Sequence, residues 1–294
     1  MPSPATPPPT HARNPLGAHV PVGPGLAKGA WRAMRDLGGD TLQVFTGNPR
    51  GWAASAGDPA QDAAFRALCE AEGVPAFVHA PYLVNLGSPN PATYEKSVAS
   101  VAHNLARTHA IGARGLVVHT GSCVDDGAYD AALAQVREGL LPLLDALPEE
   151  GPRLLLEPTA GQGRSLCAKV DDLEPYLEAL ERHPRVGICL DTCHAFAAGE
   201  PLDEPTGVAA TLECLVEVAG PGRLALVHAN DSKDVRGSFK DRHERIGVGH
   251  LGKDAFAAML AHPATVGVPF VLETPGGADA WREDLALLAS LRPQ

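Results

Sequence analysis

Histidine, aspartate and glutamate residues end a series of short apolar segments in this sequence, and these residue types bind metal ions. The clearest case is RVGICLDTCHAFAAG at 185–199, where an apolar run has the length of a buried strand and stops at Asp191 and His194. Taken alone, Asp191 would be a helix cap and His194 a partly buried polar residue. The same pattern recurs along the chain, and this favours one shared site.

The strand-end residues together form a set of nitrogen and oxygen donors. They are His79, His119, Glu157, Asp191, His194, His228 and Glu273, joined by Asp241 and His243 from the DRH motif in a later loop. Five imidazoles and four carboxylates suit divalent ions such as zinc or manganese, and are too rich in nitrogen for calcium or magnesium. One zinc takes about four ligands, so nine donors indicate two or three ions that share bridging carboxylates. A lone histidine of this kind is more often only hydrogen-bonded, but nine such accidents are improbable.

The segments that must position these donors alternate between strand-like and helix-like patterns. Strands are predicted at 16–20, 41–45, 76–79, 115–119, 153–157, 186–191, 224–228 and 269–273, and helices at 26–37, 60–72, up to about 111, 129–147, 170–182, 208–219, 253–261 and 278–291. Eight strand–helix units predict an α/β fold, a single-domain (β/α)8 TIM barrel, whose strand C-termini converge on one face. A doubly wound sheet would normally carry a glycine-rich phosphate loop after its first strand, and none is present in that form. His19 ends the first strand, either as support for the site or as a core residue.

Composition sets the limits of the domain and of its partners. Residues 1–15 are rich in proline and predict an extended, solvated arm, so the barrel domain is assigned to 16–294. The formal charge is 24 − 35 = −11, so a nucleic-acid substrate has to be argued from local charge. No apolar stretch is long enough to span a bilayer, and we expect no membrane partner. Six irregularly spaced cysteines favour reduced thiols and a cytoplasmic location.

Several longer motifs resemble the endonuclease IV family of apurinic/apyrimidinic (AP) endonucleases. They are HAPYLVNLG at 79–87, VHTGS at 118–122, LEPTAGQG at 156–163, GICLDTCHAFAAG at 187–199, VHANDSK at 227–233, DRHERIGVG at 241–249 and VLETP at 271–275. The resemblance implies a TIM barrel with three zinc ions per chain, the cofactor of this family. It implies one zinc at His79, His119 and Glu157; a second at Glu157, Asp191, His228 and Glu273; and a third at His194, Asp241 and His243.

The resemblance also implies a reaction and a substrate. The reaction is hydrolysis of the phosphodiester 5′ to an abasic site in duplex DNA during base excision repair, which leaves a 3′-hydroxyl and a 5′-deoxyribose phosphate. Glu273, which would orient or deprotonate the attacking water, and the bridging Glu157 are the predicted catalytic residues. Arg50 and Tyr82 match positions that insert into the DNA in this family.

A second predicted DNA contact is the basic loop that follows the seventh strand. Within residues 232–245, Lys233 and Arg242 are the candidates for binding phosphates, together with Arg236, Lys240 and Arg245. A solvated charge run is the alternative for each of these side chains. Gly51 stands where the family commonly has a glutamine that helps fill the gap in the DNA, so the grip on DNA is expected to differ.

Two other functions remain open from the sequence. A sugar isomerase or epimerase of the xylose isomerase-like class would use Glu157, Asp191, His228 and Glu273 with one metal, and would leave five donors without a role. A protein that binds damaged DNA or zinc without turnover is the second alternative, and Gly51 alone supports it. We therefore predict a zinc-dependent AP endonuclease that acts as a monomer.

Overall fold

The eight predicted strands form a closed parallel barrel in the computed structural model, which describes residues 13–125 and 127–293. The strands are β1 (Leu16–His19), β2 (Thr41–Val44), β3 (Ala76–His79), β4 (Gly115–His119), β5 (Arg153–Glu157), β6 (Val186–Asp191), β7 (Leu224–His228) and β10 (Phe270–Leu272). They are hydrogen-bonded in the order β1-β10-β7-β6-β5-β4-β3-β2, so β1 closes the barrel against β10. The predicted TIM barrel is confirmed.

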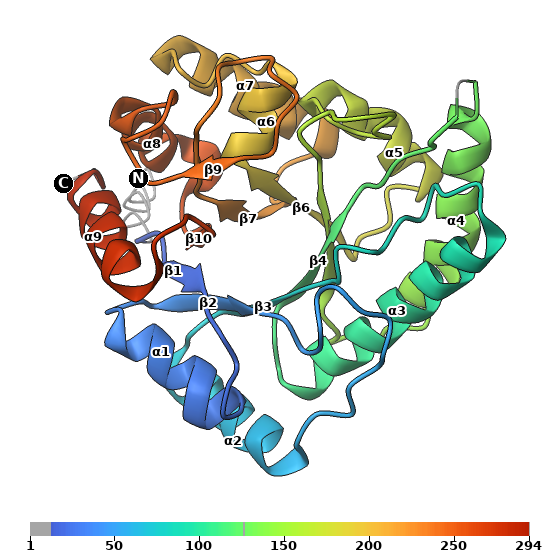
Figure 1. Cartoon of the computed structure of the whole chain (residues 1–294), viewed down its shortest axis with the longest axis horizontal. Helices are drawn as coiled ribbons and strands as arrows, with labels where there is room; N and C mark the ends of the chain where they lie inside the picture. The colour runs from blue at the N-terminus through green and yellow to red at the C-terminus, as the bar shows by residue number, and fades with distance from the viewer. Residues whose placement is uncertain (1–12, 126, 294) are drawn as a thin grey trace, which may run out of the picture.

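Helices surround the barrel as an outer ring, except for the short α6, which lies over the C-terminal end of β6 (Figure 1). They are α1 (Trp31–Asp36), α2 (Pro59–Glu72), α3 (Pro91–Ala110), α4 (Tyr129–Asp145), α5 (Leu173–Ala179), α6 (Thr192–Ala198), α7 (Pro205–Ala219), α8 (Lys253–Ala261) and α9 (Gly277–Ser290), with the short turns η1 (Leu26–Ala30), η2 (Val170–Asp172) and η3 (Pro263–Thr265). Local sequence signals set several ends: Asp58 caps α2 by accepting from the backbone N–H of Ala60, and Gly73 ends α2 in the left-handed region.

Two hydrophobic layers hold the fold together. One lies between the strands and the helices, and the other fills the barrel interior with Phe77, Val117, Leu155, Cys189, Leu226 and Val271. The inner six come from six different strands, and each side chain two residues further along its strand points to the same interior. The barrel is therefore packed below and opens only at the C-terminal ends of its strands.

Some elements differ from the sequence prediction. The predicted helix at 26–37 begins with the π-helical turn η1, and the helix predicted at 170–182 ends at Ala179 because Glu181 and Arg182 have positive φ. Helix α6 was not predicted as a separate element, nor was the pair β8 (Asp231–Ser232) and β9 (His243–Glu244). These short elements depend on contacts with distant segments, which the local pattern does not contain.

The boundary of the N-terminal arm also differs. Residues 1–12 of the expected arm lie outside the described residues. Asn14 is buried, and its side-chain amide donates to the carbonyls of Thr265 and Val268; the carbonyl of Pro15 accepts from Phe270 N at 2.8 Å. The barrel therefore includes Asn14 and Pro15, which the sequence prediction had assigned to the arm. No helix within residues 13–125 or 127–293 has the length and apolar character needed to cross a membrane.

Substitution Gly17→Ala tests the close approach of β1 and β2. A methyl group at Gly17 would lie 1.8 Å from the carbonyl oxygen of Thr41, and a backbone atom cannot move aside without disturbing the barrel. We expect the free energy of unfolding to fall by about 3 kcal/mol, the upper range for overpacking. Urea unfolding measures it, with Gly47→Ala as control because a methyl group there meets nothing closer than 3.7 Å. Equal loss in both variants would contradict the steric argument.

Candidate metal centre

Six of the nine predicted donors follow directly from the strand geometry. Each lies two residues beyond a side chain of the inner core and so points into the mouth of the barrel: His79, His119, Glu157, Asp191, His228 and Glu273. The strand register places His119 beside Glu157 and Asp191 beside His228. Neighbouring strands therefore bring these donors together although up to 194 positions (273 − 79) separate them in the chain.

The other three donors are His194 on α6, Asp241 on the loop between β8 and β9, and His243 at the start of β9. Asp191 caps α6, accepting from the backbone N–H of His194 at 2.8 Å, and this fixes the first turn of the helix over the site. The interpretation of Asp191 as a helix cap is thus correct, but the same carboxylate also faces the cluster. On the loop, Asp241 lies 3.2 Å from His194 Nε2 and 3.1 Å from His243 Nε2.

The nine side chains form three groups whose candidate ligand atoms lie within 4.8 Å of one another. The groups are His79, His119 and Glu157; Glu157, Asp191, His228 and Glu273; and His194, Asp241 and His243. These are the same three sets that the family resemblance implied. Glu157 belongs to two of them, with one oxygen 3.1 Å from His79 Nε2 and the other 3.0 Å from His228 Nδ1. The structure thus places all nine predicted donors at one site.

Each of four imidazoles uses one ring nitrogen for a fixed oxygen outside the cluster. The acceptors are the carbonyls of Ala80 for His79 Nδ1 (2.7 Å), Pro158 for His194 Nδ1 (3.2 Å) and Glu273 for His243 Nδ1 (3.3 Å), and the side-chain oxygen of Gln43 for His228 Nε2 (2.9 Å). Donation through one nitrogen leaves the other nitrogen directed at the carboxylates, where its lone pair can bind a metal ion once the proton is lost, as in metal-binding histidines.

Two buried nitrogen atoms indicate what the third group lacks. Nε2 of His194 and Nε2 of His243 are buried and make no hydrogen bond within the described residues, although Asp241 oxygens lie close to both. Buried polar atoms are rarely left without a partner. A cation between these three side chains would satisfy both nitrogens, so the donors fit a metal ion.

The carboxylates and imidazoles of the cluster stabilise one another's charges. Burial by itself would raise the pKa of Glu157, but the positive charges of His228 and His119 outweigh burial and hold this pKa well below its ordinary range. Burial would lower the pKa of His194, yet Asp191 and Asp241 raise it to about 10. In the absence of metal, protons on the imidazoles therefore take the place of cations.

Two thiols lie beside the site but are poor ligands. Cys189 is close to Glu157 and His228, and Cys193 is close to Asp191 and His243. Burial raises the pKa of Cys189 to about 12 and raises that of Cys193 even further above its ordinary value. Both thiols are therefore protonated in the metal-free chain, and the three donor groups are complete without them.

Above the donors is an open cavity of about 350 Å³. It is lined by His79, Tyr82, His119, His194, Asp241, His243, Glu273 and Pro275. Tyr82 is 52% exposed, and its ring packs edge-on against Phe45 (5.3 Å) and His79 (5.6 Å). The predicted DNA-contacting tyrosine thus stands at the rim of the donor cluster.

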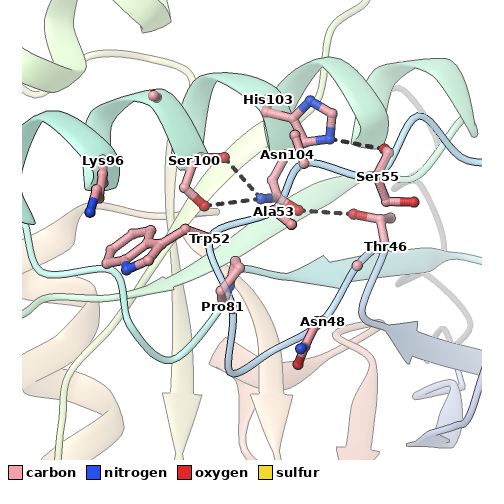
Figure 2. Close-up of a pocket in the computed structure, with 14 residues that line it drawn as sticks. Thr46, Asn48, Trp52, Ala53, Ser55, Pro81, Lys96, Ser100, His103 and Asn104 are labelled. Carbon is pink, nitrogen blue, oxygen red and sulfur yellow. Dashed lines mark hydrogen bonds between the residues drawn. The ribbon is translucent and has the colours of Figure 1, made fainter.

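Arg50, the second predicted DNA-inserting residue, lies exposed on a loop that is anchored to α3. A hollow of about 140 Å³ lies between this loop and the helix. Figure 2 shows the hydrogen bonds beside it: Thr46 donates to Asn104 Oδ1 (2.9 Å), and His103 Nε2 lies 3.0 Å from the Ser55 carbonyl. These polar groups pair with one another and attach the loop to α3, so the hollow has a structural role. The Pro49 carbonyl accepts from Tyr82 N at 3.0 Å, so the loops of Arg50 and Tyr82 are joined.

The predicted basic loop is largely neutralised by acidic partners. Arg242 and Lys240 pair with Asp234, Arg236 pairs with Asp203 and Glu204, and Arg245 pairs with Glu283 and Asp284. Lys233 is exposed and has no acidic partner within ion-pair distance in the described part of the chain. Of the two phosphate-binding candidates, Lys233 is available and Arg242 is already paired.

Three side chains that support the donors were missed or left open. His19 Nδ1 lies 2.9 Å from Glu273 Oε1, which decides its role in favour of the site. Asn230 donates to Asp191 Oδ2 at 2.7 Å and accepts from Glu273 N at 2.8 Å. Gln43 is fully buried between His228 and Glu273. A polar residue within the apolar run at 41–45 was the signal that could have identified Gln43.

Comparison with known proteins agrees with this architecture. The family model described as "Xylose isomerase-like TIM barrel" matches residues 31–291. The protein named "Probable endonuclease 4" from Streptomyces avermitilis is 57% identical over 282 residues, 96% of this chain and 91% of that protein. Its namesake from Methanoculleus marisnigri is 40% identical over 278 residues, 94% of this chain and 97% of that protein.

Solved structures of similar fold agree with these sequence matches. The crystal structure of endonuclease IV from Thermus thermophilus has a TM-score of 0.83 and 34% identity, covering 94% of this chain and 98% of that chain. A D-tagatose 3-epimerase-like protein has a TM-score of 0.67 but 19% identity, covering 94% of this chain and 97% of that chain, and so shares only the fold. Because the similarity in sequence and fold extends over nearly the whole chain, this chain belongs to the endonuclease IV family of AP endonucleases.

Proposed function

We propose that this chain holds three zinc ions and uses them to hydrolyse the phosphodiester 5′ to an abasic site in duplex DNA, leaving a 3′-hydroxyl and a 5′-deoxyribose phosphate. The observation that carries the proposal is the set of three donor groups around one open cavity, linked by Glu157. His79, His119 and Glu157 would hold one ion; Glu157, Asp191, His228 and Glu273 a second; and His194, Asp241 and His243 the third. The proposed setting is a monomer in the cytoplasm.

The protein residues divide the work around this centre. Bound zinc ions make hydroxide available near neutral pH and neutralise the attacking and leaving oxygens of a phosphodiester. Glu273 faces the cavity, and its carboxylate is held by His19 and Gln43. Burial would raise the pKa of Glu273, but His228 and His19 lower it strongly, so the carboxylate is a weak base. Its role is therefore to orient the attacking water by accepting a hydrogen bond.

Substrate selection follows from the missing base. An abasic nucleotide has lost its stacking, so turning it out of the duplex into the cavity costs less than for an intact nucleotide. Tyr82 at the rim of the cavity and Arg50 on the adjoining loop would occupy the space that this nucleotide leaves, and the hydrogen bond between their loops supports this proposal. Lys233 would contact a phosphate of the flanking backbone, and Arg242 could do so only by leaving Asp234.

Substitution Tyr82→Ala tests the proposed contact with DNA. A ring that stacks against a base contributes about 1–3 kcal/mol, so we expect duplex binding to weaken about tenfold while the single-turnover cleavage rate of bound DNA changes less. Fluorescence anisotropy with an abasic duplex measures the affinity. Tyr82→Phe keeps the ring and serves as the matched control. Unchanged affinity of Tyr82→Ala would remove Tyr82 from the DNA contact.

A combined measurement of metal and cleavage tests the function itself. Wild-type protein is expected to contain about three zinc ions per chain and to cut a duplex 5′ to one synthetic abasic site. In His119→Ala we expect loss of zinc from one group and a decrease in cleavage on the order of a hundredfold. One metal with ketose epimerase activity and no cleavage would favour the sugar isomerase alternative. Zinc and tight lesion binding without cleavage would favour the binding protein.

A further inference from the structure

Gln43 occupies a position in the barrel where most other strands carry an ionisable group. It follows Thr41 on the inner face of β2, in register with His19 on β1, and its side chain is fully buried. The residues that end β3 to β7 and face the same interior are His79, His119, Glu157, Asp191 and His228. A buried neutral amide at this place must have its donors and acceptor satisfied by the cluster.

The contacts of Gln43 fix the orientation of its amide. The side-chain oxygen lies 2.9 Å from His228 Nε2, and the nitrogen lies 2.8 Å from Glu273 Oε1 and 3.0 Å from His19 Nδ1. Exchanging the two ends would place a carbonyl oxygen against the carboxylate of Glu273, where no donor exists. The amide nitrogen must therefore face Glu273.

This orientation determines which ring nitrogen of His228 carries a proton in the neutral imidazole. An amide oxygen can only accept, so His228 must carry a proton on Nε2. The neutral imidazole then has its lone pair on Nδ1, which lies 3.0 Å from Glu157 Oε1 and 3.4 Å from Glu273 Oε2. Gln43 thus holds His228 in the tautomer that a metal ligand requires.

The same amide assigns separate roles to the two oxygens of Glu273. Oε1 accepts from Gln43 and lies 2.9 Å from His19 Nδ1, while the backbone N–H of Glu273 donates to Asn230. Oε2 makes neither of these contacts and faces His228 Nδ1. One oxygen is therefore used by the supporting residues and the other remains for the cluster.

We infer that Gln43 is a positioning residue that selects the His228 tautomer and the Glu273 oxygen offered to the metal. The inference rests on the proposed zinc site and extends it to a residue that touches neither metal nor substrate. Supporting hydrogen bonds of this kind change metal affinity by about 10- to 100-fold. The effect should concentrate on the ion shared by Asp191, His228 and Glu273.

The experiment compares Gln43→Leu with the wild type by zinc titration against a chromophoric chelator and by single-turnover cleavage. We expect one of three zinc sites to weaken about 10- to 100-fold, and the cleavage rate to fall by a similar factor with less than about threefold change in DNA affinity. Excess zinc should restore part of the rate, which a general folding defect would not allow. Gln135→Leu on α4, whose amide donates to the Ser88 carbonyl, is the matched control.

Gln43→Asn provides a second variant if the leucine protein does not fold. Its amide is one methylene shorter and cannot reach His228 and Glu273 together, so we expect the same selective loss of one zinc site. Three zinc sites of unchanged affinity in either folded variant would overturn the inference. A wild type that binds no zinc would instead overturn the proposed function, so the two failures are distinguishable.

Discussion

Glu157→Gln is expected to reduce cleavage of an abasic duplex by at least about a thousandfold, because it removes the charge that links two of the three donor groups. The carboxylate is fully buried, with Oε2 near His79 and His119 and Oε1 near His228. Glutamine has almost the same shape but no charge, and one of its two ends is an N–H donor. That donor would face imidazole nitrogens whose lone pairs are needed for metal.

Metal content and unfolding must be measured together with cleavage in this variant. We expect the variant to bind fewer than three zinc ions and to keep the circular dichroism spectrum of the wild type. Glu149→Gln makes the same chemical change at an exposed residue outside the donor cluster, and it should leave all three quantities unchanged. Cleavage by Glu157→Gln within tenfold of the wild type would show that the two groups do not depend on a shared carboxylate.

Removal of metal is expected to abolish cleavage. It should also make the stability of the fold depend on protons bound to the histidines of the cluster. After treatment with a strong chelator, activity should fall below about 1% and return when zinc is added, because no other group in the cavity supplies hydroxide at neutral pH. The measurement is the cleavage rate against added zinc. Undiminished activity of protein shown to be free of metal would contradict the proposed mechanism.

The metal-free protein should also lose stability as pH rises. The pKa of His194 is about 10 and that of His243 about 9 in the folded chain, against 6.5 for an unperturbed histidine, after Asp191 overcomes the effect of burial on both. A raised folded-state pKa stabilises the fold fully below pH 6.5, and the contribution disappears as pH rises through 9 and 10. Between pH 7 and 9.5 the free energy of unfolding should fall by about 5 kcal/mol from the two histidines together.

Urea unfolding of the metal-free and zinc-loaded proteins at pH 7 and 9.5 tests the direction of this change in stability. In the zinc-loaded protein the ions replace the protons, so we expect a much smaller decrease over the same interval. The carboxylates act in the opposite direction: burial would raise the pKa of Asp241, but His194 and His243 lower it strongly, so its contribution is lost only in acid. A metal-free protein that gained stability toward pH 9.5 would show that the imidazoles do not carry the compensating protons.

The sequence by itself determined the barrel and the identity of the donors. Short apolar runs that end in His, Asp or Glu are a local property, and the alternation of a strand places residue i+2 on the same face as residue i. Phe77 and His79, or Leu155 and Glu157, therefore occupy the same wall of the barrel once a strand is recognised. The family motifs contain these nine donors, and the resemblance to the family implied how they divide into three sets.

Tertiary structure alone decided how the donors are oriented and which other residues support them. The tautomer of His228 depends on Gln43, 185 residues away, and the orientation of Glu273 depends on His19, 254 residues away across the closure between β1 and β10. The basic loop showed the same limit, since Asp234 neutralises Arg242 only after the loop folds back at β8 and β9. The contacts of His228 and Glu273 join distant segments across the barrel, and the pair of Arg242 with Asp234 needs the folded loop, so a local pattern of residues carries no information about such pairs.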